Sequence, residues 1–206
     1  MDPLQLKYLD LYLMHWPLAH VNRGDGDSAV DANNVRIVDT EVTVKETWKA
    51  MEKLFDEGKV KAIGVSNFNI AKLKDLLTYA RIKPAVNQVE LHPYLAQSEL
   101  VDFCKANDIV MTAFSPLGAK PAPGTVFYDP VVEAIAKAND MTNAQVLISW
   151  GIQRGTTVIP KSSNIARIKE NFQVKELSAK DMEALNALDQ GKRYVDPAPF
   201  WKVEIY

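Results

Sequence analysis

The stretch Thr156–Asn171, TTVIPKSSNIARIKEN, joins a short apolar run to the start of a cationic helix. The β-branched residues Thr157–Ile159 indicate a buried strand, which Pro160 ends. A helix is predicted to begin near Ser163 or Asn164. A strand that leads directly into a helix is typical of α/β folds, in which function gathers at the strand ends.

The start of this helix also suits a phosphate group. The free backbone amides at a helix N-terminus carry partial positive charge. Lys161 adds a point charge, and Arg167 can grip phosphate oxygens with a fork of N–H donors. Because Lys-Ser pairs are common, an ordinary solvated helix start with surface cations fits the same residues.

Strands and helices alternate along the rest of the chain. Apolar runs bounded by turn residues predict strands, and apolar residues three or four apart predict helices. Thr43 with Glu46, and Thr142 with Gln145, have the spacing of capping boxes. Strands are expected at 9–15, 60–65, 85–91, 109–114 and 157–159, and helices at 43–57, 70–80, 98–107 and 178–188, with others opening at Asp129 and Thr142. A loop is expected at 20–39 and an aromatic tail at 191–206.

This alternation, repeated five times, predicts parallel strands covered by helices. Two architectures satisfy it, a doubly wound sheet and a (β/α) barrel. No linker interrupts the pattern, and 206 residues with 47% hydrophobic content can bury a sizeable core. Residues 1–206 are therefore predicted to form one α/β domain.

Composition argues against several other classes of protein, namely nucleic-acid-binding, membrane and secreted proteins. A net charge of −2 with interspersed signs predicts no binding to nucleic acid or anionic membranes. No apolar run reaches the roughly 18 residues of a membrane span, and the first ten residues do not resemble a secretion signal. The single cysteine, Cys104, forms no internal disulfide and favours a cytoplasmic location, with its side chain as core filler.

Two further features of the sequence argue against a metal site and against a glycine-rich dinucleotide motif. Three histidines without an HExxH motif or a cysteine pair predict no metal site. The segment GDGDSA at 24–29 matches the dinucleotide fingerprint G-x-G-x-x-A formally. No strand leads into it and no helical pattern follows, so the match is interpreted as accidental.

Polar or aromatic residues stand at all five predicted strand ends, where both architectures place their chemistry. Amides and a hydroxyl can bond a carboxamide, an aromatic face can stack on a flat ring, and the cationic helix start can take a phosphate. This set describes a nicotinamide dinucleotide bound in extended form, although a sugar-phosphate barrel enzyme fits almost as well. These residues are His15, Ser66, Asn67, Gln88, Phe114, Ser115, Lys161 and Ser162.

Five longer motifs resemble the aldo-keto reductases, in order and at the right separations, within a likeness that runs from Leu4 to Tyr206. They are DLYLMHWP, GKVKAIGVSNFN, PAVNQVELHPYL, MTAFSPLGA and VIPKSSNIARIKENF. The closing RYVDPAPFW resembles the fungal-type branch that includes xylose, arabinose, glycerol and galacturonate reductases. The resemblance implies a (β/α)8 TIM barrel that reduces small carbonyl compounds or sugars to alcohols with NADPH, which becomes NADP+.

The same resemblance implies roles for single residues. His15 matches the histidine that donates a hydrogen bond to the substrate carbonyl, and Trp16 faces the substrate. Phe114 stands where the family usually places a stacking tyrosine. The other matches are Ser66, Asn67 and Gln88 for the nicotinamide carboxamide; Ser115, Leu117 and Gly118 for the pyrophosphate; Lys161, Ser162, Ser163, Asn164 and Arg167 for the 2′-phosphate; and Glu170 and Asn171 for adenine. Without the family, Asn87 and Gln88 fit ordinary strand amides and Glu170 a solvated helix residue.

Two departures from the family pattern affect the expected activity. Val195 stands where xylose reductases carry an asparagine, which argues against xylose as the substrate. The family's catalytic aspartate, tyrosine and lysine precede the matched motifs, so His15 is the one tetrad member expected here. We therefore expect an N-terminally truncated barrel of about five βα units, with unpaired first and last strands and exposed apolar residues.

Three hypotheses follow. The chain is a fragment of an active NADPH-dependent reductase, an inactive short isoform that binds NADPH or a partner through its open edges, or an unrelated phosphate-binding barrel enzyme. The isolated chain is expected to be marginally stable, oligomeric or insoluble, because its edge strands are unpaired. Stable soluble expression of these residues alone would favour the second hypothesis.

Overall fold

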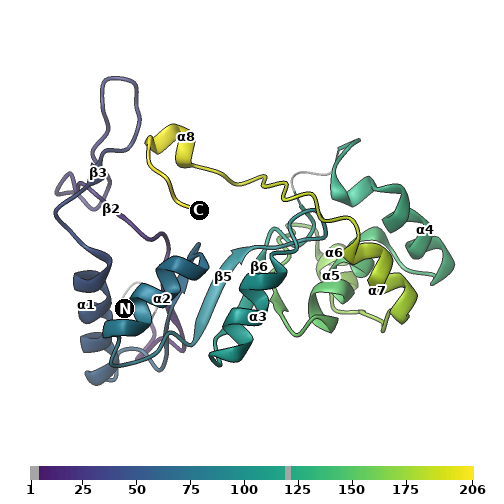
Figure 1. The fold of residues 1–206 in the computed structure, drawn as a ribbon, viewed down its shortest axis with the longest axis horizontal. Helices are drawn as coiled ribbons and strands as arrows, with labels where there is room; N and C mark the ends of the chain where they lie inside the picture. Colours follow the sequence, from purple (N-terminus) through teal and green to yellow (C-terminus); the bar gives the residue numbers. More distant parts are fainter. Residues whose placement is uncertain (1–4, 119–121) are drawn as a thin grey trace. The chain divides into compact units, whose positions relative to one another are not determined.

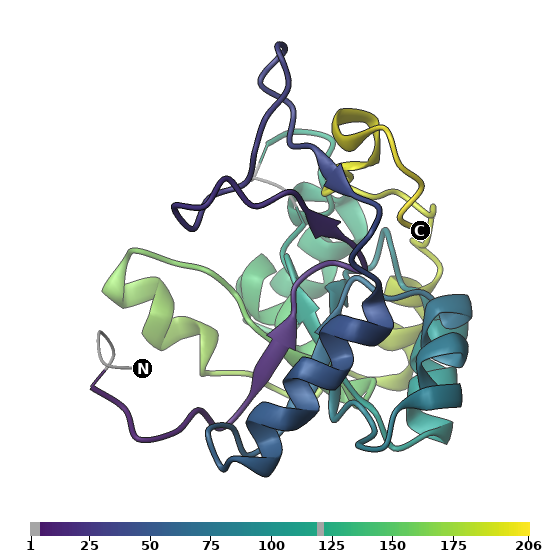
Figure 2. The same ribbon diagram turned by 90° about the vertical axis from the view of Figure 1, so that its left-hand side faces the viewer.

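The computed structural model describes residues 5–118 and 122–206 (Figures 1 and 2). Its strands are β1 (Tyr12–Met14), β2 (Ala19–His20), β3 (Val38–Asp39), β4 (Ile63–Ser66), β5 (Val86–Glu90), β6 (Val110–Phe114) and β7 (Thr157–Val158). Its helices are α1 (Val44–Asp56), α2 (Ile70–Tyr79), α3 (Ser98–Ala106), the 3-10 helix η2 (Val126–Tyr128), α4 (Pro130–Ala138), α5 (Asn143–Gln153), α6 (Ile165–Asn171), α7 (Ala179–Asn186) and α8 (Ala198–Trp201). The predicted alternation of strands and helices is confirmed.

Local capping explains why these helices begin where they do. Thr43 caps α1 and Thr142 caps α5, each in a complete capping box with the residue three positions on. Asn69 and Asp129 cap α2 and α4 with their side chains, and Asn164 caps α6 in the same way. Each cap satisfies backbone amides that have no partner inside the helix.

The chain forms two compact units, and the first comprises the described residues up to Asn87 together with 106–109 and 196–206. Here β1 pairs with β4 in parallel, and β4 is followed across the sheet by β5. The helix α1 packs on β1, β4 and α2 (Figure 2). The core is built from side chains no more than 1% exposed, namely Trp48, Ile63, Val65, Phe68, Leu73 and Leu76.

The second unit comprises residues 88–105 and 110–195, again of those described. The end of β5 is followed by β6 and then by β7, and β6 and β7 pair in parallel. The helix α4 packs on α5 and α7, and α5 packs on β7 and α6 (Figure 1). Its core side chains, at most 1% exposed, include Leu91, Val126, Val132, Leu147, Trp150 and Leu185. Cys104 is fully buried, as predicted.

Four local features differ from the sequence-based expectation. The strand expected to be buried at Thr157–Ile159 is partly uncovered, because Thr157 is exposed and Ile159 is 48% exposed. The segment 20–39 contains an antiparallel ribbon rather than a plain loop, because β2 and β3 pair through Ala19 with Asp39 and His20 with Val38. The aromatic tail contains the one-turn helix α8. The strand expected at 9–15 shortens to β1 and is not covered on both sides, because Leu11 is 38% and Tyr12 is 43% exposed.

The helix α6 has no apolar face turned to a core. None of its residues is buried, and Ile165 is 72% exposed. Phe172, which follows the helix, is 84% exposed. The expectation of exposed apolar side chains is therefore confirmed at β1 and at α6. In the described part of the chain, no helix combines the length and apolar character that crossing a membrane requires.

We expect the double substitution Ile165→Ser and Phe172→Ser to reduce the binding of a hydrophobic dye with little loss of stability. Exposed substitutions usually change stability by less than about 0.5 kcal/mol, which moves the melting temperature by about 1–2 °C at this size. Leu185→Ala is the matched control, since it empties a buried site and costs about 2–5 kcal/mol.

Dye fluorescence and thermal melts measure both quantities. A drop of many degrees in the double variant would show that the α6 surface is covered in the protein.

Candidate functional site

In the first unit, strand register brings the candidate carbonyl-facing residue beside two candidate cofactor residues. Met14 is the register partner of Val65 in the parallel β1–β4 pair. The next residues along the two strands, His15 and Ser66, therefore leave the sheet at the same edge. His15 is exposed and Ser66 is buried, with 3% of its surface accessible.

Asn67 ties these two strand ends together. Its Nδ2 donates to the carbonyl of His15 at 2.9 Å and lies 3.2 Å from Ser66 Oγ. The residue is 2% exposed and adopts a left-handed φ of 65°, a conformation that asparagine tolerates better than most residues. Its Oδ1 is buried and has no hydrogen-bond partner among the described residues.

An unpaired buried carbonyl oxygen costs about 1–3 kcal/mol, so the Oδ1 of Asn67 is a place where a ligand N–H is favoured. A carboxamide is the group that offers such a donor and also accepts in return. The residues present therefore fit a nicotinamide carboxamide at this point. Phe68, the next residue, is fixed in turn by Asn87, whose Nδ2 donates to its carbonyl at 2.9 Å. For Asn87, the interpretation as a structural strand amide fits this bond.

Aromatic side chains surround Trp16. The ring of His15 stacks on it at 5.7 Å, and Trp201 and Tyr206 approach edge-on at 5.0 and 6.5 Å between centroids. His20 contacts Trp201 at 4.7 Å. Sequence reasoning named Trp16 but missed His20, Trp201 and Tyr206, and the aromatic character of the closing PFW was the available signal.

His20 is the titratable group of this cluster with a perturbed pKa. Burial, and secondarily the positive charge of Arg36, lower the pKa of His20 below its ordinary value of 6.5. Its Nε2 is buried without a partner among the described residues. Both observations favour the neutral imidazole in the folded state.

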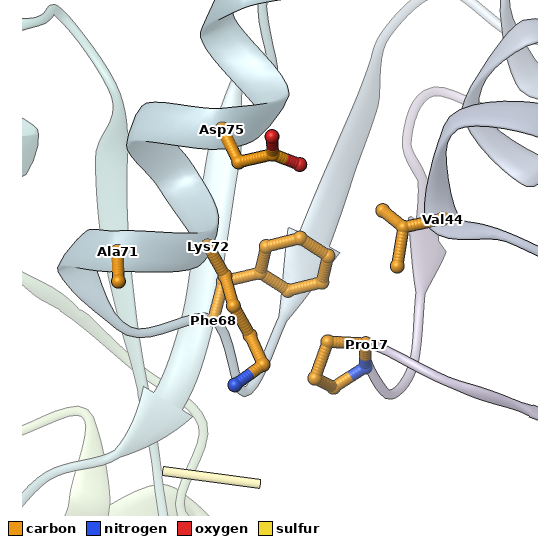
Figure 3. A pocket seen from close by; sticks show the side chains of 6 residues that line it. All are labelled: Pro17, Val44, Phe68, Ala71, Lys72 and Asp75. Atoms are coloured by element: carbon orange, nitrogen blue, oxygen red, sulfur yellow. The ribbon is translucent and has the colours of Figure 1, made fainter.

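A small open pocket of about 320 Å³ lies close to this cluster in the first unit (Figure 3). The ring of Phe68 lies in its lining between Pro17 and Val44 on one side and Lys72 on the other. Lys72 Nζ donates to the carbonyl of Ile205 at 2.6 Å and so fastens α2 to the tail. The sequence predicted none of this pocket.

In the second unit, Phe114–Gly118 turns sharply at the end of β6. Ser115 and Gly118 have left-handed φ values of 48° and 75°, and the amide of Gly118 donates to the carbonyl of Ser115 at 2.8 Å. A Cβ on Gly118 would lie 2.6 Å from Val126 Cγ1. Gly118 is thus required both by its backbone angle and by space. Phe114, Leu117 and Gln88 are half-buried in the same unit.

The predicted phosphate cradle is also in the second unit. Lys161, Ser163 and Arg167 are exposed around the start of α6. Ser162 Oγ accepts from the Asn164 amide at 3.1 Å, and Asn164 Oδ1 accepts from the Arg167 amide at 3.2 Å. The loop is therefore ordered by its own polar side chains while its two cations reach solvent.

Glu170 is more constrained than a solvated helix residue. Its Oε1 accepts from Thr142 Oγ1 at 2.8 Å, and its main-chain carbonyl accepts from Gln145 at 3.3 Å. Glu170 and its neighbour Asn171 are both half-buried. Within 5–118 and 122–206, no group of three or more His, Cys, Asp or Glu side chains could hold a metal ion.

Comparison with known proteins agrees with this α/β architecture. The model of the aldo/keto reductase family matches residues 1–190. Aldose reductase B of Dictyostelium discoideum is 46% identical over the whole chain, which covers 67% of that protein. The glycerol 2-dehydrogenase (NADP(+)) of Hypocrea jecorina is 43% identical over 93% of the chain and 62% of its own length.

A solved structure extends the likeness to three dimensions. The aldose reductase of Giardia lamblia has a TM-score of 0.91 and 42% identity, and the chain covers 70% of it. The parallel strand–helix alternation thus matches that of the aldose reductase TIM barrels. The chain belongs to the aldo/keto reductase family and spans about two thirds of the length of these relatives.

We expect Asn67→Ala to be less stable than Asn67→Gly, although both remove the bond to His15. Alanine pays the left-handed backbone cost of about 1–2 kcal/mol, which glycine avoids. The melting temperature of the alanine variant should lie a few degrees lower. Equal melting temperatures would show that residue 67 does not hold this conformation in solution.

We expect His20 to make stability fall in mild acid. Because the folded-state pKa of His20 is lowered, the unfolded chain takes up a proton first as the pH drops below 6.5. The contribution of His20 to the free energy of unfolding is fully present above pH 6.5. It decreases as the pH falls from 6.5 towards the pKa of His20 in the folded state. Unfolding free energies at pH 7 and 5 should therefore differ less in His20→Phe than in the wild type. An equal difference in both proteins would contradict a buried neutral imidazole.

Proposed function

We propose that this protein binds NADPH and reduces small carbonyl compounds or sugars to alcohols. Asn67 carries most of this proposal, because its Nδ2 is bonded to the His15 carbonyl and its Oδ1 is buried without a hydrogen-bond partner among the described residues. Membership of the aldo/keto reductase family supports the reaction type, and the name of the Hypocrea jecorina relative supports NADP over NAD.

Each unit carries residues that we assign to the cofactor. In the first unit, Ser66 and Asn67 are assigned to the nicotinamide carboxamide by their match to the family. In the second unit, Gln88 is assigned to the same group on the same ground. The second unit also supplies the following residues: Phe114 for ring stacking; Ser115, Leu117 and Gly118 for the pyrophosphate; Lys161, Ser162, Ser163, Asn164 and Arg167 for the 2′-phosphate; and Glu170 and Asn171 for adenine. When bound, NADPH supplies the hydride.

His15 and Trp16 face the substrate in this proposal. The imidazole of His15 donates a hydrogen bond to the carbonyl oxygen, which polarises the C=O bond and orients the substrate. The aromatic rings of Trp16 and Trp201 offer an apolar surface beside His15. The tail, which resembles the fungal-type branch, supports a reductase that acts on small carbonyl compounds or sugars. Val195 argues against xylose as the substrate. The lone cysteine supports a cytoplasmic location.

A second function is supported by one specific observation. Of the family's catalytic tetrad, these 206 residues contain a match to the histidine alone, His15. The alternative is a chain that binds NADPH, or a partner at its exposed apolar residues, without reducing carbonyls. A polypeptide of these 206 residues should bind NADPH and oxidise it near background with DL-glyceraldehyde, since a positioned acid contributes about 10²–10⁴ in rate. Ordinary turnover that His15→Ala abolishes would show that another group supplies the proton.

Arg167→Ala tests the cofactor assignment. Charge-assisted hydrogen bonds are worth roughly 1.5–3 kcal/mol, so NADPH should bind about ten-fold more weakly or worse, while NADH changes little. Lys169→Ala is the matched control, because Lys169 is an exposed cation of the same helix without an assigned contact. Fluorescence titration measures both ligands, and equal weakening of NADPH and NADH would remove Arg167 from the 2′-phosphate site.

A further inference from the structure

A fully buried carboxylate lies at the end of β5 in the second unit. Glu90 is 0% exposed. Its Oε1 accepts from the amide of Tyr194 at 2.8 Å, and its Oε2 accepts from the amide of Val195 at 2.9 Å. His92 Nε2 lies 3.0 Å from Oε1 and donates a third bond. The two amide bonds fasten residues 194–195 to the end of β5, and the His92 bond ties the turn after β5 to the same carboxylate.

The ionised carboxylate is the form that these donors favour. Burial alone would raise the pKa of Glu90, but the bonds from His92 and from the two amides outweigh it and leave the pKa below its ordinary value. Glu90 therefore binds the two backbone amides as an ionised carboxylate, and its negative charge strengthens each hydrogen bond. None of the proposed cofactor contacts involves Glu90.

The side chain of Tyr194, fixed in this way, reaches the proposed pyrophosphate loop. Its ring lies 5.0 Å from the ring of His92, and its Oη accepts from the amide of Val126 at 3.3 Å. A Cβ built on Gly118 would lie 3.1 Å from Tyr194 Cε2. The ring and Val126 together fill the space on the side of Gly118 where a side chain would otherwise point.

The Ser115–Gly118 loop needs such support. Ser115, which is not glycine, holds a φ of 48°, and Gly118 holds 75°. Non-glycine residues in the left-handed region persist where the surroundings enforce them. The hydrogen bond from the Gly118 amide to the Ser115 carbonyl closes the turn. This bond lies within the loop, so it does not fix the position of the loop relative to Val126.

We propose that Tyr194, anchored by Glu90, is a positioning residue that holds the Ser115–Gly118 loop in the conformation that binds the cofactor pyrophosphate. This inference rests on the proposed NADPH function. Residues 194–195 of the tail then raise the affinity for the cofactor because they position the loop, without contacting the cofactor themselves. A role in packing alone would affect stability without selecting between ligands.

Two ligands separate these roles. NADP+ carries the pyrophosphate and the 2′-phosphate, whereas adenosine 2′-monophosphate carries the 2′-phosphate without a pyrophosphate. Tyr194→Ala should weaken NADP+ binding at least five-fold and change adenosine 2′-monophosphate binding less than two-fold. Tyr194→Phe, which keeps the ring and loses Oη, should restore most of the NADP+ affinity. Leu185→Ala, a buried site on α7, is the destabilised control and should leave the ratio of the two affinities unchanged.

Titration calorimetry of each variant measures its affinities for NADP+ and adenosine 2′-monophosphate and so separates positioning from packing. If Tyr194→Ala does not fold, Glu90→Gln is measured in its place. Glu90→Gln should shift the two affinities in the same unequal way. Equal weakening of both ligands, or no weakening of NADP+, in a folded variant overturns the positioning role. Failure of the wild type to bind NADP+ while it binds adenosine 2′-monophosphate overturns the proposed cofactor, and this inference with it.

Discussion

The parallel register of β1 and β4 is the constraint on which the carbonyl end of the proposed site depends. Met14 opposite Val65 places His15 and Ser66 at one edge, and Asn67 then joins them by donating to the His15 carbonyl. A shift of one residue would turn each side chain to the opposite face of the sheet. Asn67 holds a left-handed backbone at this point, both contacts of its Nδ2 are made within the protein, and its Oδ1 has no partner among the described residues.

Much of this architecture could be predicted because its signals are local. Capping residues such as Thr43, Thr142 and Asn164 fix helix starts through bonds to residues three positions away. Polar strand ends could be predicted too, since parallel strands share one functional edge. The role of each residue at that edge came from family likeness, and the positions given to NADPH remain proposals supported by Asn67, Gly118 and the exposed cations of α6.

The features that escaped prediction depend on contacts between distant residues. The β2–β3 ribbon forms through the pairs Ala19 with Asp39 and His20 with Val38, which are 20 and 18 residues apart in a polar segment without hydrophobic alternation. His20 and Trp201 meet although 181 residues separate them, and the buried Glu90 carboxylate finds its partners at Tyr194 and Val195. Leu11 and Phe172 show the opposite error. Their apolar character indicates burial, but both side chains are exposed because no described residue covers them.

Hydrogen–deuterium exchange with and without NADPH tests the central claim most directly. The account predicts that NADPH slows exchange of backbone amides in three separate segments, at 66–68, 115–118 and 161–168. It also predicts that NADH protects the first two segments more than the third, because Lys161 and Arg167 are assigned to the 2′-phosphate that NADH lacks. Protection confined to one segment, or none at saturating NADPH, would contradict a cofactor bound by all three.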